Sequence, residues 1–201
     1  MKIKLLQPRF AYGANSYLIS SNDEYMVIDP SSADSLPEVR DKLKFVFLTH
    51  SHIDHMLLLD KWITESSAPL LLAEPDIPLL TDSEFNCHRL FFGCDGGYYG
   101  EATPLSDGDT VSLGDEVLRV MITPGHTNGS TVLVGDGYAF VGDLVFKGGG
   151  FGRYDFKTGD PIKLFKSIER LLELDDDTVL YPGHGEPTTV SDYKSAFSKY
   201  R

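Results

Sequence analysis

The chain contains, from residue 45 to residue 55, the sequence Phe45-Val46-Phe47-Leu48-Thr49-His50-Ser51-His52-Ile53-Asp54-His55. Its first part, residues 45–49, is rich in aromatic and β-branched side chains. It predicts a strand buried on both faces, as in a parallel sheet. The second part is a cluster of polar side chains at the point where that strand ends and a loop begins. Functional side chains are often mounted on a rigid scaffold in this way.

The cluster places four candidate metal ligands within six residues: His50, His52, Asp54 and His55. His50 and His52 are two positions apart, so in extended chain their rings point to the same side. Asp54 and His55 can face a second point if the chain turns there, so one cluster can serve two neighbouring metal ions. The alternative is a polar turn that happens to contain histidines. Because burying three imidazoles beside a carboxylate requires pairing or neutralisation, the pattern favours a metal site.

Length and composition describe an ordinary globular protein. The 201 residues predict one domain spanning 1–201, with 41% hydrophobic and 24% charged residues. A formal charge of −12 argues against binding to nucleic acid or to an anionic membrane surface. No signal peptide and no run of membrane-spanning length is recognised. Cys87 and Cys94 are too few for a disulfide framework. We therefore expect a soluble, cytoplasmic protein.

Hydrophobic periodicity divides the chain into predicted elements. Residues 1–6 are strand-like, and further strands are predicted at 14–20, 25–29, 45–49, 70–73, 110–113, 116–121, 131–134, 138–141 and 178–181. Helices are predicted at 37–42, 56–65, 161–174 and 189–199. The longest begins at Pro161 after an Asp160 cap, and its predicted buried stripe is Ile162, Phe165, Ile168 and Leu172. This order predicts an α/β fold (α+β in some schemes) of two packed sheets with helices outside.

Residues 74–104 show no clean period. A long irregular loop in a compact domain is often functional, and this one either shapes a pocket or only covers the surface. Within it, Cys87, His88 and Cys94 are interpreted as structural. Two aromatic pairs, Phe91-Phe92 and Tyr98-Tyr99, either line an apolar entrance or belong to the core.

Three further candidate ligands, His126, Asp143 and His184, each follow directly on a predicted strand. Flanking glycines would allow the backbone to approach a crowded centre closely. Taken singly, His126 could cap a turn, Asp143 could cap a helix and His184 could be an exposed loop residue. Together with the first cluster they make seven N/O ligands at strand ends, which favours a shared metal centre.

With these seven candidate ligands, the sequence resembles the metallo-β-lactamase superfamily, and within it the glyoxalase II-like hydrolases (hydroxyacylglutathione hydrolase relatives). The resemblance covers nearly the whole chain and rests on separated stretches in order: Asn15 to Ile19, Ile28 to Pro30, Thr49 to His55, Thr123 to Ser130, Gly142 to Phe146, and Pro182 to Gly185. It implies an αββα sandwich of two mixed β-sheets with helices on the outer faces. The metals would lie in a cleft at one edge of the sheets.

The resemblance also implies the ligand sets. His50, His52 and His126 would hold a first metal. Asp54, His55 and His184 would hold a second, and Asp143 would bridge the two. These residue types suit two divalent ions, with Zn²⁺ preferred and Fe or Mn also compatible. A bridging hydroxide would attack the carbonyl of a small thioester or ester, such as a hydroxyacylglutathione, with Asp54 and Asp143 as the catalytic carboxylates.

The chain departs from the family pattern in two places. Met56-Leu57-Leu58-Leu59 replaces a small residue and glycines, which would narrow the cleft floor or alter the approach of the next helix. The chain also ends at residue 201, without the C-terminal helical part that helps full-length glyoxalase II enzymes bind glutathione. Arg153 is the best candidate for a cleft cation that orients a substrate carboxylate. Its alternative role is a structural pair with Asp155.

Other functions compatible with the fold were weighed. The segment Gly152 to Phe156 resembles one in mononuclear iron persulfide dioxygenases, which is the main alternative. A metal-binding protein without activity is disfavoured by the complete ligand set. A β-lactamase is disfavoured by the lack of a recognised export signal.

Overall fold

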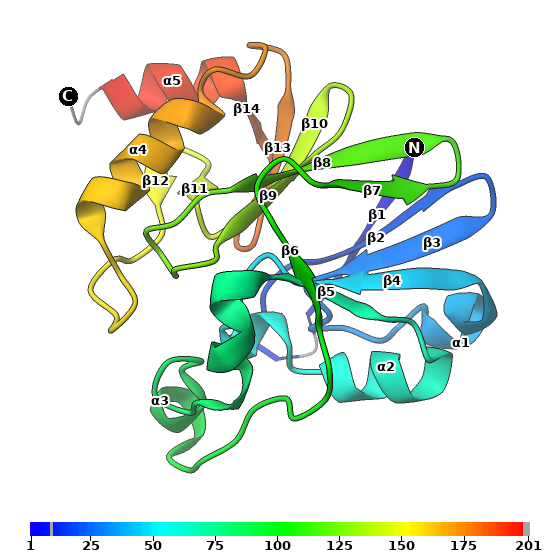
Figure 1. The fold of residues 1–201 in the computed structure, drawn as a ribbon. Helices are drawn as coiled ribbons and strands as arrows, with labels where there is room; N and C mark the ends of the chain where they lie inside the picture. The colour runs from blue at the N-terminus through cyan, green and yellow to red at the C-terminus, as the bar shows by residue number, and fades with distance from the viewer. Residues whose placement is uncertain (9, 199–201) are drawn as a thin grey trace.

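The computed structural model describes residues 1–8 and 10–198. Within these residues the main strands form two six-stranded mixed sheets that pack face to face. Helices cover the outer face of each sheet, with α1 and α2 on one side of the molecule and α4 and α5 on the other (Figure 1). The predicted αββα sandwich is confirmed.

The first sheet combines antiparallel and parallel pairing. Its strand order is β1-β2-β3-β4-β5-β6, antiparallel from β1 to β3 and parallel from β3 to β6. All four residues of β5 are buried, as expected of a strand with covered faces. The strands are β1 Lys2–Leu6, β2 Ser16–Ser21, β3 Glu24–Ile28, β4 Leu43–Phe47, β5 Leu70–Ala73 and β6 Thr103–Leu105.

The second sheet has the order β14-β13-β10-β9-β8-β7. The turn at residues 135–137 joins β9 and β10 as the predicted antiparallel hairpin. β10 and β13 are parallel, because α4 forms the crossover between them. The strands are β7 Thr110–Leu113, β8 Glu116–Ile122, β9 Thr131–Val134, β10 Tyr138–Gly142, β13 Val179–Pro182 and β14 Thr188–Thr189, with a separate ribbon of β11 Val145–Phe146 and β12 Gly150–Phe151.

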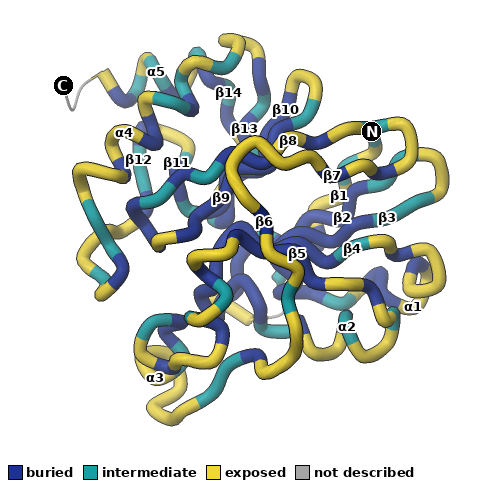
Figure 2. The backbone as a smooth tube through the Cα atoms, in the orientation of Figure 1, coloured by how far each residue is buried: buried dark blue, intermediate teal, exposed yellow. Residues whose placement is uncertain are grey.

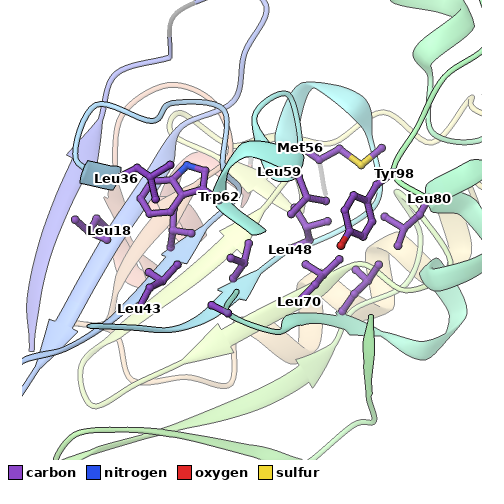
Figure 3. Close-up of a cluster of buried hydrophobic side chains, with 14 of the residues drawn as sticks. Leu18, Leu36, Leu43, Leu48, Met56, Leu59, Trp62, Leu70, Leu80 and Tyr98 are labelled. Atoms are coloured by element: carbon purple, nitrogen blue, oxygen red, sulfur yellow. The ribbon is translucent and has the colours of Figure 1, made fainter. Parts of the chain in front are cut away.

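Three apolar layers hold the sandwich together: the first lies on the outer face of the first sheet, the second lies between the sheets, and the third lies over the second sheet. Tyr17, Phe47 and Phe140 belong to the second layer, between the sheets. On the outer face of the first sheet, fully buried Trp62 of α2 packs among leucines and donates its indole N–H to the Ser32 carbonyl at 2.8 Å (Figure 3). Leu164 of α4 belongs to the third layer, over the second sheet. The strands that contribute side chains to two of these layers are buried through most of their length, as the dark blue in Figure 2 shows. Packing therefore holds these strands where the loops begin.

The helices are α1 Leu36–Val39, α2 Leu59–Ser66, α3 His88–Phe92, α4 Pro161–Leu171 and α5 Val190–Phe197, with 3-10 turns η1 Arg40–Lys42, η2 Ile53–His55 and η3 Glu74–Thr81. α2 begins at Leu59 rather than at residue 56, because the ligand cluster continues into η2. The predicted end of the last helix at residue 199 lies outside the described residues. No helix of the described residues is both long and apolar enough to cross a membrane.

The predicted buried stripe of α4 is correct at Ile168 but wrong at Ile162 and Phe165. Leu164, Ile168 and Leu171 are buried, whereas Ile162 is 69% exposed and Phe165 38% exposed. The predicted stripe and the observed one both contain Ile168, so periodicity alone does not choose between them. Packing of α4 on the rest of the protein decides, because the Leu164 backbone lies directly against the Gly125 turn and leaves no room for a β-carbon on Gly125.

The stretch 74–104 is not a simple loop. It contains η3, α3 and β6. Pro75 occupies an early position of η3, where its missing N–H is tolerated. Tyr98 is buried in the first apolar layer, whereas most of α3 is exposed (Figure 2). Part of the segment therefore joins the core and part stands at the surface.

Candidate metal centre

All seven predicted ligands gather where four strands end. They lie in the segments that follow β4, β8, β10 and β13. Three groups of side chains have ligand atoms within 4.8 Å of one another: His50, His52 and His126; His50, His55 and Asp143; and Asp54, His55 and His184. Residues more than 130 positions apart in sequence thus meet at one edge of the sandwich.

The first group consists of three buried imidazoles whose nitrogens converge. His52 Nδ1 lies 3.1 Å from His50 Nε2 and 2.9 Å from His126 Nε2. The opposite ring nitrogens are occupied, because His50 Nδ1 donates to the Thr49 hydroxyl at 3.1 Å and His126 Nδ1 donates to the Arg153 carbonyl at 2.7 Å. This fixes the tautomers so that the lone pairs of His50 and His126 point inward. Converging lone pairs fit a cation between them.

Asp29 orients the same side of the centre, and sequence reasoning did not assign it a role. Its carboxylate accepts from the Thr49 backbone N–H and hydroxyl, both at 2.8 Å, and from His55 Nδ1 at 2.9 Å. His55 Nε2 has no hydrogen-bond partner among the described residues, and it faces Asp143 Oδ1 at 3.3 Å. The sequence could have indicated this role, because Asp29 directly follows β3, the strand that pairs with β4.

The second group is built around carboxylates. Asp54 Oδ2 lies 3.1 Å from His184 Nε2 and 3.9 Å from His55 Nε2. Asp143 Oδ2 lies 3.6 Å from both His126 Nε2 and His184 Nε2, so this carboxylate stands between the two groups. The His184 side chain is 40% exposed, whereas that of His126 is 3% exposed. The second group therefore faces solvent and the first does not.

Burial and neighbouring charges divide the two groups electrostatically. Burial lowers the pKa of His50 well below its usual value, and it lowers the pKa of His52 to about 3. Burial acts on His55 in the same direction, but the carboxylates of Asp29 and Asp143 prevail and raise the pKa of His55 well above its usual value. Burial thus favours the neutral imidazoles of His50 and His52, whereas neighbouring carboxylates favour the charged imidazole of His55.

The two carboxylates stay ionised although they are buried. Burial raises the pKa of a carboxyl group, yet His55 and the other imidazoles hold the pKa of Asp143 well below its usual range. The pKa of Asp54 is lowered by His55 and His184 in the same way. Asp143 Oδ1 has no hydrogen-bond partner among the described residues. An ionised, buried and unpartnered carboxylate oxygen beside bare imidazole nitrogens fits a metal ion.

Asp76 joins the loops that carry the first group, and sequence reasoning missed it. It is fully buried, and its carboxylate accepts from the Ser51 backbone N–H at 3.0 Å, from the Thr127 hydroxyl at 2.8 Å and from the Gly129 N–H at 2.6 Å. Burial raises the pKa of Asp76, and these hydrogen bonds act against that rise. A β-carbon on Gly129 would lie 2.8 Å from Asp76 Oδ1, so glycine is required at this contact.

A cavity of about 370 Å³ opens beside the centre. Besides ligand side chains it is lined by Cys87, Phe91, Phe146, Phe151, Arg153 and Phe156. The interpretation of Cys87 as purely structural is therefore incomplete, since it faces the cavity. Met56 packs in the first apolar layer instead and is not among the residues that line the cavity, so it does not narrow its floor.

Arg153 lies at the cavity and is also paired with Asp155, the structural partner considered for it. It lines the cavity, and it forms a two-pronged ion pair with Asp155 at 2.9 and 2.8 Å. Its guanidinium also lies over the Phe156 ring, 4.3 Å from the centroid. Arg153 is thus positioned at the cavity with its charge already compensated.

Comparison with known proteins identifies relatives over most of the chain. A sequence model of the Metallo-beta-lactamase superfamily matches residues 9–184. An uncharacterised protein of Mycobacterium leprae is 33% identical, with 88% of each chain covered. A probable metallo-hydrolase of Bacillus subtilis is 32% identical over 88% of this chain and 87% of its own. A hydroxyacylglutathione hydrolase of Buchnera aphidicola is 28% identical over 83% of this chain and 60% of its own.

Solved structures share the fold. The B3 metallo-beta-lactamase BLEG-1 superposes with a TM-score of 0.86 at 27% identity, covering 96% of this chain and 97% of its own. A protein crystallised in a di-iron-bound form has a TM-score of 0.80 at 27% identity, with 98% of both chains covered. ETHE1 from Myxococcus xanthus has a TM-score of 0.78 at 26% identity over 98% of this chain and 83% of its own.

Proposed function

The chain belongs to the metallo-beta-lactamase superfamily, and from that premise we propose that it is a dinuclear metal-dependent hydrolase of a small thioester or ester. Relatives named as probable metallo-hydrolases support the reaction class. The observation that carries the proposal is the position of Asp143, whose two oxygens lie within 3.6 Å of imidazoles from both ligand groups.

In this proposal His50, His52 and His126 would hold one ion. Asp54, His55 and His184 would hold the other, and Asp143 lies where it would contribute to both. The nitrogen and carboxylate donors suit Zn²⁺ first, with Fe or Mn also compatible. The di-iron form of a structural relative supports two sites but does not choose the metal. Bound there, two divalent cations supply an activated water and polarise the substrate carbonyl.

The side chains of the chain divide the remaining work. Asp54 lines the cavity and is ionised at neutral pH, since its pKa is lowered by His55 and His184. It can therefore hold a cation as the anion and help to orient the attacking water. A thiolate leaves readily as the anion, so a thioester needs no separate general acid. Hydroxyacylglutathiones are candidate substrates, supported by the name of the Buchnera relative.

The test is metal content and hydrolysis measured on the same sample. Protein loaded with Zn²⁺ is assayed with S-D-lactoylglutathione and with a panel of simple thioesters and aryl esters. Two metals per chain with thioester or ester hydrolysis is the expected result. Asp54→Asn should lose both the second metal and most activity, while Asp60→Asn, on the exposed face of α2, should lose neither. Full activity in Asp54→Asn would refute the two-metal proposal.

A second candidate is a mononuclear iron persulfide dioxygenase. It is favoured by the likeness to ETHE1 from Myxococcus xanthus and by the Gly152–Phe156 stretch, which places Arg153 at the cavity. The contact of Asp54 with His184 at 3.1 Å speaks against it, because a single-metal site has no need of that pair. Oxygen uptake with glutathione persulfide by protein holding one iron per chain would support the dioxygenase. No uptake under the same conditions would remove it.

A further inference from the structure

The cavity beside the metal centre is walled by phenylalanines. The Phe156 ring lies 5.1 Å from that of His52 and 5.9 Å from that of His126, beside the first ligand group. Phe146 lies 6.2 Å from His184, beside the second group. A substrate whose carbonyl reaches either group must therefore pass along aromatic rings.

The aromatic wall continues out of the cavity. Phe91, at its edge, lies 5.8 Å from Tyr12, which stacks on Phe10 at 5.6 Å and meets Phe92 at 5.7 Å. These four side chains, Phe10, Tyr12, Phe91 and Phe92, are 39–42% exposed and form what we call the aromatic strip. They come from the segment before β2 and from α3. Contiguous exposed rings leading into a ligand cavity indicate a binding surface rather than chance exposure.

Positive charge at the cavity is already compensated. Among the described lining residues, Arg153 carries the one permanent positive charge, and it is paired with Asp155. The same holds for neighbouring cations on the surface, which pair as Lys147 with Glu186, Arg89 with Asp95, and Lys157 with Glu84. With a formal charge of −12 on the whole chain, nothing here is arranged to attract a polyanionic substrate.

We propose that the cavity and the aromatic strip select a thioester or ester with an apolar acyl group, aromatic or of medium chain length, on a carrier without carboxylates. This inference rests on the proposed function and narrows its substrate class. The acyl group packs against Phe91 and Phe156, while the scissile carbonyl faces the ligand groups. A carrier with two carboxylates, such as glutathione, finds no unpaired cation.

The experiment compares matched substrates on the Zn²⁺-loaded full chain. Acetyl, hexanoyl and phenylacetyl thioesters of neutral N-acetylcysteamine are assayed beside the phenylacetyl thioester of glutathione and S-D-lactoylglutathione. We expect kcat/KM to rise about tenfold or more from acetyl to phenylacetyl, as burial of a ring predicts. For the phenylacetyl pair, kcat/KM should be higher with the neutral carrier. If kcat/KM for S-D-lactoylglutathione equals or exceeds that for the phenylacetyl thioester of N-acetylcysteamine, the inference is overturned and the hydrolase proposal stays intact.

Two variants locate the effect. Phe91→Ala should lower kcat/KM about tenfold more for the phenylacetyl substrate than for the acetyl substrate. Leu90→Ala removes a neighbouring side chain of α3 that is 65% exposed and is not among the residues lining the cavity, and it should change neither. If Phe91→Ala behaves like Leu90→Ala on both substrates, the aromatic strip does not bind the acyl group.

A binding measurement separates this inference from the proposed function. Calorimetric titration of the loaded protein with phenylacetate and with acetate compares two acids that share a carboxylate and differ in apolar surface. Tighter binding of phenylacetate, weakened in Phe91→Ala, is the expected result. Equal affinity would contradict the inference. If the loaded protein hydrolyses no thioester or ester, the proposed function fails, and this titration still decides whether the pocket is selective for apolar groups.

Discussion

The two ligand groups of the centre are built differently. His50, His52 and His126 are at most 3% exposed, burial lowers the pKa of His50 and of His52, and hydrogen bonds hold the far ring nitrogens of His50 and His126. The other group contains Asp54 and His184, the latter with a 40% exposed side chain. The two groups of candidate ligands thus differ in burial and in their content of carboxylates, although Asp143 lies beside both.

Replacement of Asp143 should have the largest effect, because its carboxylate faces both groups. We expect Asp143→Ala to lose at least about a thousandfold in kcat/KM, corresponding to roughly 4 kcal/mol of transition-state stabilisation. Metal content should fall from two per chain towards one, as measured by mass spectrometry. Asp136→Asn in the β9–β10 hairpin is the matched control. Retention of two metals by Asp143→Ala would show that this carboxylate does not join the sites.

The histidines at the two ends of the centre should respond differently. His184→Ala should lose one metal and about a hundredfold in kcat/KM, roughly 2.7 kcal/mol. His126→Ala should lose the metal of the buried group and the other metal as well, because Asp143 and His52 both lie beside the His126 imidazole. His88→Ala, outside the centre, serves as control. Identical metal contents in His184→Ala and His126→Ala would remove the distinction between the groups.

Asp76 tests whether the buried group depends on support from beyond its ligands. Asp76→Asn keeps the shape of the side chain, but its amide can no longer accept hydrogen bonds at both ends. We expect metal affinity at the three-histidine group to fall about tenfold to a hundredfold, as for other supporting hydrogen bonds. Competition with a chelator measures this. If folding is lost instead, far-UV circular dichroism shows it. Unchanged affinity in a folded variant would reduce Asp76 to a structural role.

Lower pH should empty the second group first. His50 and His52 have lowered pKa values, so protons compete little for their nitrogens. The pKa of His55 is raised, and a metal binding there must displace its proton. Affinity at the second group should therefore fall up to about tenfold per pH unit below that pKa. Equilibrium dialysis from pH 8 to pH 5 should show two metals falling to one. Loss of both together would contradict the comparison.

Much of the centre was predictable because each ligand follows a strand. Strand ends on one sheet edge meet whatever their separation in sequence, so His126, Asp143 and His184 could be placed beside the first cluster. Asp76 could not, because it lies in a stretch without periodicity and its partners are distant in the chain.

The α4 face shows a second limit. Two stripes through Ile168 are equally apolar in sequence, and the contact of Leu164 with the Gly125 turn selects one of them. That contact joins segments almost forty residues apart, and no local pattern records it. The ion pairs that compensate Arg153 and its neighbours are likewise visible only once the loops are folded. Local chemistry was therefore readable from the sequence, whereas the choice between equivalent packings was not.

The most direct test of the account is the number of Zn²⁺ ions bound per chain at neutral pH, in the unsubstituted protein and in Asp54→Asn side by side. If two differently built groups share Asp143, the unsubstituted protein should bind two ions. Asp54→Asn should bind one, held by His50, His52 and His126. One ion per chain in both proteins would contradict the dinuclear centre.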